Sequence, residues 1–120
     1  MNHAGIYHRP ESEFAYLYTK DVMRIRLQTT RAEIESVGLI SGDFYTFAKE
    51  KWYQEQQPMK KAYTTEFHDY WEIEVTAPHR RLAYGFCLTD PKGEQAFYND
   101  QGVFDYTLER LSQDNLYFRM

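Results

Sequence analysis

The residues of this chain that could perform covalent chemistry are few. Its single cysteine, Cys87, falls in the middle of an expected strand, among small residues and without a turn to expose the thiol. Reactive thiolates need an electropositive and accessible setting, and no base is identified beside this one. The sequence therefore predicts that Cys87 is a small apolar side chain of the interior and not a nucleophile.

Metal and cofactor sites are not indicated either. The four histidines, His3, His8, His68 and His79, show no zinc-type spacing with one another or with the lone cysteine. The segment Ser41–Asp43 lacks the flanks of a nucleophile elbow, and its glycine belongs to no phosphate-binding pattern. We predict a turn at this segment, and we expect no metal, cofactor or catalytic residue in the chain.

Paired carboxylates are the remaining chemistry to consider, because glycoside hydrolases need only two at the right separation. The 18 acidic residues permit many pairs, and nothing in the sequence singles one out. Glu72 and Glu74 would share an open strand face, where both carboxylates would be solvated. The sequence offers no catalytic pair.

The charge and length of the chain exclude several classes of function. With 14 Lys and Arg against 18 Asp and Glu, the formal charge is −4, so the basic field that nucleic-acid backbones require is missing. The 120 residues suffice for one domain with its own core. No apolar run approaches the roughly 20 residues that cross a membrane. The lone cysteine and an N-terminus without an apolar signal region favour a cytoplasmic protein.

Apolar and polar residues alternate with a period of two along much of the chain. The elements that would position any site are therefore expected to be strands. In residues 22–28, Met23, Ile25 and Leu27 point to one side and mostly polar neighbours to the other, as in a half-buried antiparallel strand. The other strand candidates are residues 14–18, 37–40, 58–63, 67–75, 81–89, 94–98 and the C-terminal segment 114–120. Turn signals separate them at intervals of about 8 to 12 residues, a spacing typical of β-sandwiches.

We therefore predict an all-β fold, an immunoglobulin-like antiparallel β-sandwich of about 7–9 strands with at most one short helix. The helix would fall within residues 104–111, where Phe104, Leu108 and Leu111 recur at helical spacing over a length that is marginal for a helix. The aromatic content of 18% suits strands and also suits the binding of planar or sugar-like partners. Composition does not decide between those two uses.

The stretch "HDYWEIEVTAPHRRLAYGF" could be a binding surface or part of the core. Alternate positions share a face in its first half, namely Phe67, Asp69, Trp71, Ile73 and Val75, and again in its second half, namely Leu82, Tyr84, Phe86 and Leu88. We predict two core strands that pair as a hairpin, with Tyr70, Glu72 and Glu74 on a solvated or domain-contacting face. Asp69 is expected near a strand end, bonded by a backbone N–H or by Arg80.

Several segments together resemble a known family. They are "IYHRP", "FAYLYTKDVMRIRLQT", "GDFY", "PMKK" and "DYWEIEVTAPHRRLAYGF", in that order between about Ile6 and Phe118. This order resembles the N-terminal domain of the cyclomaltodextrinase, neopullulanase and maltogenic amylase group. That group belongs to the alpha-amylase superfamily, glycoside hydrolase family 13, and its N-terminal domain is classed as carbohydrate-binding module family 34.

The resemblance implies that residues 1–120 are a single N-terminal carbohydrate-binding and dimerisation domain. In the family a linker and a (β/α)₈ catalytic barrel follow downstream, and such a barrel needs roughly 250 residues of its own. We therefore expect no enzymatic activity from this chain, and a parent protein that is a glycoside hydrolase acting on alpha-1,4 and alpha-1,6 glucans.

The resemblance also implies where the domain acts. In these enzymes the N-terminal domain commonly packs across the partner subunit of a homodimer, where it narrows the mouth of the active site and favours cyclodextrins and short maltooligosaccharides. The loop responsible would carry Tyr45, Phe47 and Trp52 as residues that bind carbohydrate or line the partner's active site. Family members often have Trp at the position of Phe47. Trp52 would equally well cover the edge of the sandwich. Because Asn2 is followed by His3–Gly5, the calcium site of some relatives is not expected here.

Three functions remain open at this point. The first is an accessory domain of an alpha-glucan hydrolase that contacts sugar and forms a homodimer. The second is a purely structural interface domain with no independent sugar binding, because half of a site binds weakly. The third is a stand-alone immunoglobulin-like adhesion or scaffold domain, which fits the fold but leaves the ordered motifs unexplained.

Overall fold

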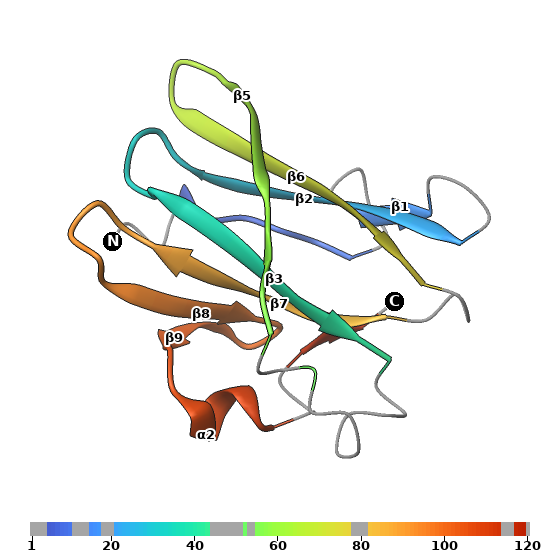
Figure 1. Ribbon diagram of the computed structural model, residues 1–120. Coiled ribbons are helices and arrows are strands. Elements are labelled where there is room, and N and C mark those ends of the chain that lie inside the picture. Colours follow the sequence, from blue (N-terminus) through green and yellow to red (C-terminus); the bar gives the residue numbers. More distant parts are fainter. Residues whose placement is uncertain are drawn as a thin grey trace.

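The computed structural model describes residues 5–10, 15–17, 21–43, 52, 55–77, 82–113 and 117–119. Its strands form two antiparallel layers that lie face to face (Figure 1). Sheet A has the order β1 (Ala15–Leu17), β2 (Val22–Thr30), β6 (His68–Thr76), β5 (Lys60–Thr64). Sheet B has the order β4 (Gln57–Pro58), β3 (Ser36–Gly42), β7 (Ala83–Thr89), β8 (Gln95–Asn99), β9 (Gly102–Asp105), with β10 (Phe118–Arg119) also paired to β7.

The fold class predicted from the sequence is confirmed. The described part of the chain holds ten strands, two of them only two residues long, and the one-turn helix α2 (Leu108–Leu111). Thr107 caps this helix, because its side chain accepts a hydrogen bond from the backbone N–H of Arg110. In the described residues no helix is long and apolar enough to cross a membrane.

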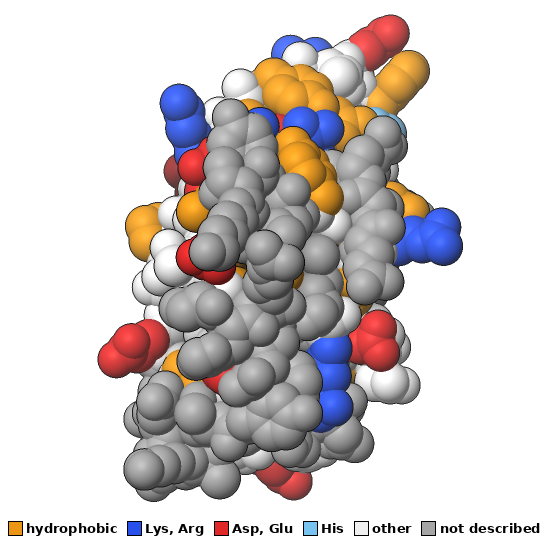
Figure 2. Space-filling view, turned by 90° about the vertical axis from the view of Figure 1, so that its right-hand side faces the viewer, with side chains coloured by type: hydrophobic (Ala, Val, Ile, Leu, Met, Phe, Trp, Pro, Cys, Tyr) orange, Lys and Arg blue, Asp and Glu red, His pale blue; other side chains and the backbone are white. Residues whose placement is uncertain are grey.

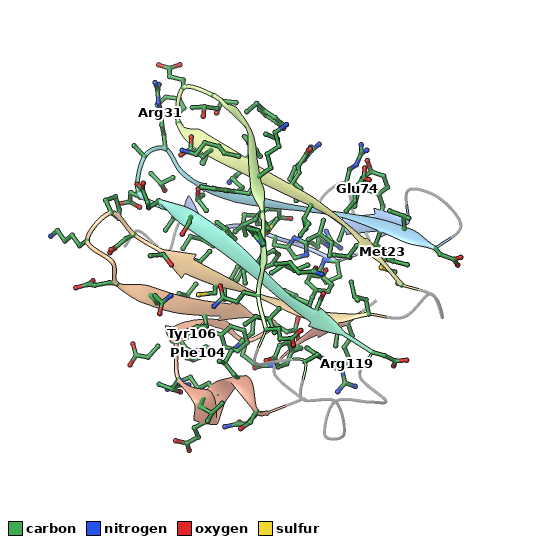
Figure 3. The ribbon with its side chains drawn as sticks, viewed as in Figure 1. Met23, Arg31, Glu74, Phe104, Tyr106 and Arg119 are labelled. Atoms are coloured by element: carbon green, nitrogen blue, oxygen red, sulfur yellow. The ribbon has the colours of Figure 1, made fainter. Side chains whose placement is uncertain are left out.

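Sheet A is organised by the pairing of β2 with β6. All nine residues of each strand are in register, from Val22 opposite Thr76 to Thr30 opposite His68. The expected alternation in β2 is confirmed, since Met23, Ile25 and Leu27 are buried between the sheets and their neighbours are half-exposed. In Figure 3 Met23 lies on the inner side of sheet A and Glu74 on its outer side.

The inner face of β6 was predicted correctly except at its first position. Trp71 and Val75 are buried in the core between the sheets, with Ile73 packed against it. Phe67, however, is 68% exposed, because it precedes β6 in the turn that connects β5 to β6. Asp69 is buried, and it accepts hydrogen bonds from the backbone N–H of Ala32 at 3.0 Å, as expected of a backbone partner, and from the hydroxyl of Thr64 at 2.7 Å.

The predicted hairpin between residues 67–75 and 81–89 is wrong. β6 pairs with β2 and β5 in sheet A, whereas β7 pairs with β3, β8 and β10 in sheet B. The chain therefore passes from one sheet to the other between Thr76 and Ala83. Alternation along a strand identifies the face that is buried, and it carries no information about which strand lies alongside.

The predicted strand at residues 58–63 is divided between the two sheets. β4 pairs with β3 of sheet B, and β5 pairs with β6 of sheet A. Met59 lies between them, buried, and its backbone N–H donates to the carbonyl of Val37 at 2.9 Å. One short stretch of backbone thus contributes to both layers, and in Figure 1 its path runs steeply from the level of sheet B to that of sheet A.

β7 is buried on both faces, of which the sequence indicated the inner face and, on the other, only Cys87. Its inner face, with Tyr84, Phe86 and Leu88, belongs to the core between the sheets. Its other face is covered by a second cluster that contains Ile40, Trp52, Ala83, Phe97, Leu111 and Tyr117. Glycine is needed under this cover, because a Cβ on Gly85 would lie 2.6 Å from the ring of Phe97.

Candidate functional site

Two of the three predicted contact residues, Tyr45 and Phe47, lie outside the described residues. Their role in contacting sugar or a partner stays a prediction. The structure does describe the residues on either side of their segment, which are Asp43 before residues 44–51 and Trp52 after them.

Trp52 is packed into the second cluster and is only 8% exposed. Its indole N–H donates to the backbone carbonyl of Asp43 at 3.1 Å. The ring lies directly over Gly42, where a Cβ would approach it to 2.4 Å. Tyr117 meets the indole edge to face, with ring centroids 5.2 Å apart and planes at 78°. The residues around Trp52 therefore hold its ring in one orientation.

This geometry ties Trp52 to the end of β3, because its indole is bonded to Asp43 and lies over Gly42. The bond to Asp43 joins the residues on either side of segment 44–51, and the missing side chain of Gly42 provides the space for the ring. A buried ring has little face left on which a sugar could stack. The position agrees with the alternative that Trp52 covers the edge of the sandwich.

The supports of Trp52 come from distant parts of the chain, and sequence reasoning missed them. The hydroxyl of Tyr117 donates to the carbonyl of Leu111 at 2.6 Å, which connects the end of α2 to the strand region before β10. Ala83 and Phe97 complete the packing from β7 and β8. The available signal was the small residues on the outer face of sheet B, Gly42 and Ala83, which leave room for large rings.

Two groups that could act as nucleophile or base, Cys87 and His8, are buried. Cys87 is buried, so the predicted interior position is confirmed, and burial raises the pKa of its thiol to about 11. His8 is enclosed by the rings of Tyr84, Phe86 and Phe118, and burial lowers its pKa to about 4, although a hydrogen bond to the Arg26 carbonyl opposes the shift.

Both ring nitrogens of His8 are engaged. Nδ1 lies 2.7 Å from the carbonyl of Arg26, which can only accept, so Nδ1 carries the proton. Nε2 lies 2.6 Å from the hydroxyl of Tyr84 and therefore accepts its hydrogen bond. A neutral imidazole with both nitrogens occupied is a structural polar group of the core.

The carboxylates of Glu72 and Glu74 also have partners. Glu72 accepts from Nε of Arg26 at 2.8 Å, and Glu74 accepts from Nη2 of Arg24 at 2.6 Å. Each glutamate is thus paired with an arginine across β2 and β6. At the end of the sandwich shown in Figure 2, acidic and basic side chains of the described residues are interspersed and form no patch of one sign.

Comparison with known proteins connects this geometry to one family. The family described as "Alpha amylase, N-terminal ig-like domain" matches residues 1–120. The intracellular maltogenic amylase of Bacillus subtilis (strain 168) is 38% identical over 119 residues, which are 99% of this chain and 20% of that protein. A cyclomaltodextrinase of Geobacillus thermopakistaniensis (strain MAS1) is 36% identical over 118 residues, which are 98% of this chain and 19% of that protein.

A solved structure shows the same likeness. A cyclomaltodextrinase superposes with a TM-score of 0.82 at 29% sequence identity, and the match covers 98% of this chain and 19% of that one. The chain therefore spans about one fifth of the length of the relatives that it matches.

Proposed function

The chain belongs to the family of alpha-amylase N-terminal immunoglobulin-like domains, and from this premise we propose that it is the non-catalytic N-terminal domain of an alpha-glucan-degrading glycoside hydrolase. Residues 1–120 would form one carbohydrate-binding and dimerisation domain, with a (β/α)₈ catalytic barrel downstream. The substrates would be maltooligosaccharides or cyclodextrins. The relative named an intracellular maltogenic amylase supports a cytoplasmic location.

The observation that carries the proposal is the closed base of segment 44–51. Trp52 and Asp43, the described residues on either side of the segment, are joined by a hydrogen bond, and the indole lies over Gly42 at the end of β3. Tyr45 and Phe47 are the two rings that this base would present. A fixed base lowers the ordering cost when such a segment contacts sugar or a partner's active site.

A second candidate is a structural interface domain that binds no sugar by itself. The burial of Trp52 favours this alternative, because it removes one of the three rings expected to contact sugar. Two rings on one segment would line only part of a pocket, and a partial pocket binds weakly in isolation.

The test compares the full-length parent enzyme with a version that lacks residues 1–120, and with the single variants Tyr45→Ala and Phe47→Ala. Loss of dimerisation, together with a changed ratio of kcat/KM for cyclodextrin over starch, is the expected result for deletion. The single variants should change that ratio and leave dimerisation intact. Phe67→Ala is the matched control, because Phe67 is an exposed ring in the turn between β5 and β6.

The same experiment separates the two candidates. If the single variants leave the ratio unchanged while the deletion abolishes dimerisation, the domain is an interface element without sugar contact. If the deletion alters neither dimerisation nor substrate preference, the proposed function is wrong.

A further inference from the structure

A row of polar side chains crosses the outer face of sheet A. The strand register places Tyr7 opposite Gln28, Gln28 opposite Tyr70 and Tyr70 opposite Tyr63. Residues that are opposite in antiparallel strands point to the same side of a sheet, and neighbouring strands are about 4.8 Å apart, so the four positions span about 14 Å. We call Tyr7, Gln28, Tyr70 and Tyr63 the tyrosine row.

A β-bulge puts Tyr63 into this row. Lys61 lies opposite Trp71, yet Tyr63 lies opposite Tyr70, so the register shifts by one residue at Ala62. Without the shift, Tyr63 would share the inner side with Lys61, two positions before it. Bulges commonly re-aim a side chain at functional sites. Here the bulge brings a third tyrosine to the face that already holds the other two.

The row is ordered before any ligand arrives. The hydroxyl of Tyr70 donates to Oε1 of Gln28 at 2.9 Å. The rings of Tyr63 and Tyr70 stack with their centroids 4.7 Å apart and their planes at 18°. The ends of the row remain accessible, since Tyr7 is 42% and Tyr63 44% exposed. Side chains held in this way lose little conformational freedom when a ligand binds.

The surroundings of the row are polar and nearly neutral. The guanidinium of Arg26 lies 5.6 Å from the ring centroid of Tyr63 and is paired with Glu72. Arg24 is paired with Glu74, which Figure 3 shows on the outer side of sheet A. No helix or strand of the described residues lies over this face (Figure 1).

This chemistry favours a neutral, polyhydroxylated ligand. The exposed parts of the Tyr7 and Tyr63 rings offer apolar surface to the C–H groups of a sugar, while the Gln28 amide and the Arg26–Glu72 pair offer donors and acceptors to its hydroxyls. A charged ligand would meet arginines that are already neutralised. A protein partner would bury the carboxylate of Glu72 next to the row, and glutamate is depleted at the centres of protein interfaces.

We propose that the tyrosine row is a binding surface for a linear alpha-glucan chain, separate from the segment that carries Tyr45 and Phe47. That the ligand is a sugar is inferred from the residues of the row. That this sugar is an alpha-glucan rests on the proposed function. The surface is open and shallow, so it would hold a chain along its length, at the outer face of sheet A.

The test is a titration of the ¹⁵N-labelled chain with maltotetraose, followed by NMR chemical shifts, up to about 10 mM, which is tenfold above a millimolar Kd. The expected result is a saturable shift of the amides of Tyr7, Gln28, Tyr63 and Tyr70. Tyr63→Ala should weaken binding roughly tenfold, the equivalent of one lost aromatic contact. Tyr63→Phe keeps the ring stack and should bind nearly as the parent chain does. Phe67→Ala is the control for removal of an exposed ring outside the row.

The outcomes separate this inference from the proposed function. Shifts confined to residues 44–51, or equal affinity in Tyr63→Ala and the parent chain, would overturn the tyrosine row and leave the proposed function standing. The amide shifts of the row could instead change with protein concentration in the absence of sugar, with dimers detected by sedimentation. That result would also overturn the glucan-binding surface, in favour of a protein partner. Row shifts that persist in Tyr45→Ala support the inference even where the proposed contact at Tyr45 fails.

Discussion

The buried imidazole of His8 makes the stability of the domain depend on pH in a defined window. An unfolded histidine takes up its proton near pH 6.5, and burial lowers the pKa of His8 in the folded protein to about 4. Between these values the unfolded chain binds more protons than the folded one, so the free energy of unfolding decreases as the pH falls. The full effect is present below the folded pKa, and stability returns as the pH rises through 6.5.

The magnitude follows from the two pKa values. Each unit of difference is worth about 1.4 kcal/mol, so lowering the pH from about 7 to about 5 should reduce the free energy of unfolding by about 2 kcal/mol. Against a typical domain stability of about 5–15 kcal/mol this is a measurable share. Carboxylates such as Asp69, whose pKa is lowered by hydrogen bonds from Thr64 and Ala32 that outweigh its burial, contribute only at lower pH.

The assay is urea unfolding at half-unit steps between about pH 7.5 and 4.5, followed by tryptophan fluorescence. His8→Gln retains a polar side chain for the Arg26 carbonyl and the Tyr84 hydroxyl, and it should lower stability at neutral pH but remove the dependence on pH in this window. His68→Gln, at a half-exposed position at the start of β6, should keep the dependence. A parent chain whose stability stays flat, or a His8→Gln chain that shows the same fall, would refute the reasoning.

Two substitutions and one reactivity measurement test the packing of the domain. Trp52→Phe removes the donor to the Asp43 carbonyl and part of the buried ring, and should lower the free energy of unfolding by about 1–2 kcal/mol in urea; a change below about 0.5 kcal/mol would show that the anchor is unimportant. Asp69→Asn keeps the shape but loses acceptor strength toward the Thr64 hydroxyl, and should cost about 1–3 kcal/mol by the same measurement, whereas an unchanged midpoint would contradict the role of this buried carboxylate. The Cys87 thiol should not react with a chromogenic disulfide reagent in native buffer at pH 8 and should react at once in urea, and rapid native reaction would disprove its burial.

The sequence was sufficient for features that depend on neighbouring residues. Alternation predicted the buried side of β2, and turn signals predicted the fold class, because strand period and turn chemistry are local properties. The interior position of Cys87 followed from its small neighbours. The one-turn helix at Leu108–Leu111 likewise lies within residues 104–111, where helical spacing predicted it.

The errors concern relations between distant residues. The partner of β6, the division of residues 58–63 between two sheets and the cover over β7 all depend on which strands meet, and alternation does not encode this. For Trp52 the sequence left two positions open, because an aromatic residue in a turn-rich loop has the same sequence signature whether its ring is exposed or lies over Gly42. The tyrosine row was missed because its members stand at positions 7, 28, 63 and 70 and meet only through the strand register and a bulge.

The passage of the chain from β4 to β5 at Met59 has a consequence for how the domain loses its structure. The backbone here is hydrogen-bonded to β3 at one end and to β6 at the other. Opening of one sheet, which hydrogen exchange of its amides requires, would therefore disturb the other sheet as well. In proteins without such a shared stretch, layers can open as separate cooperative units. The central amides of both sheets in this domain should therefore exchange with one common opening free energy, as a single unit.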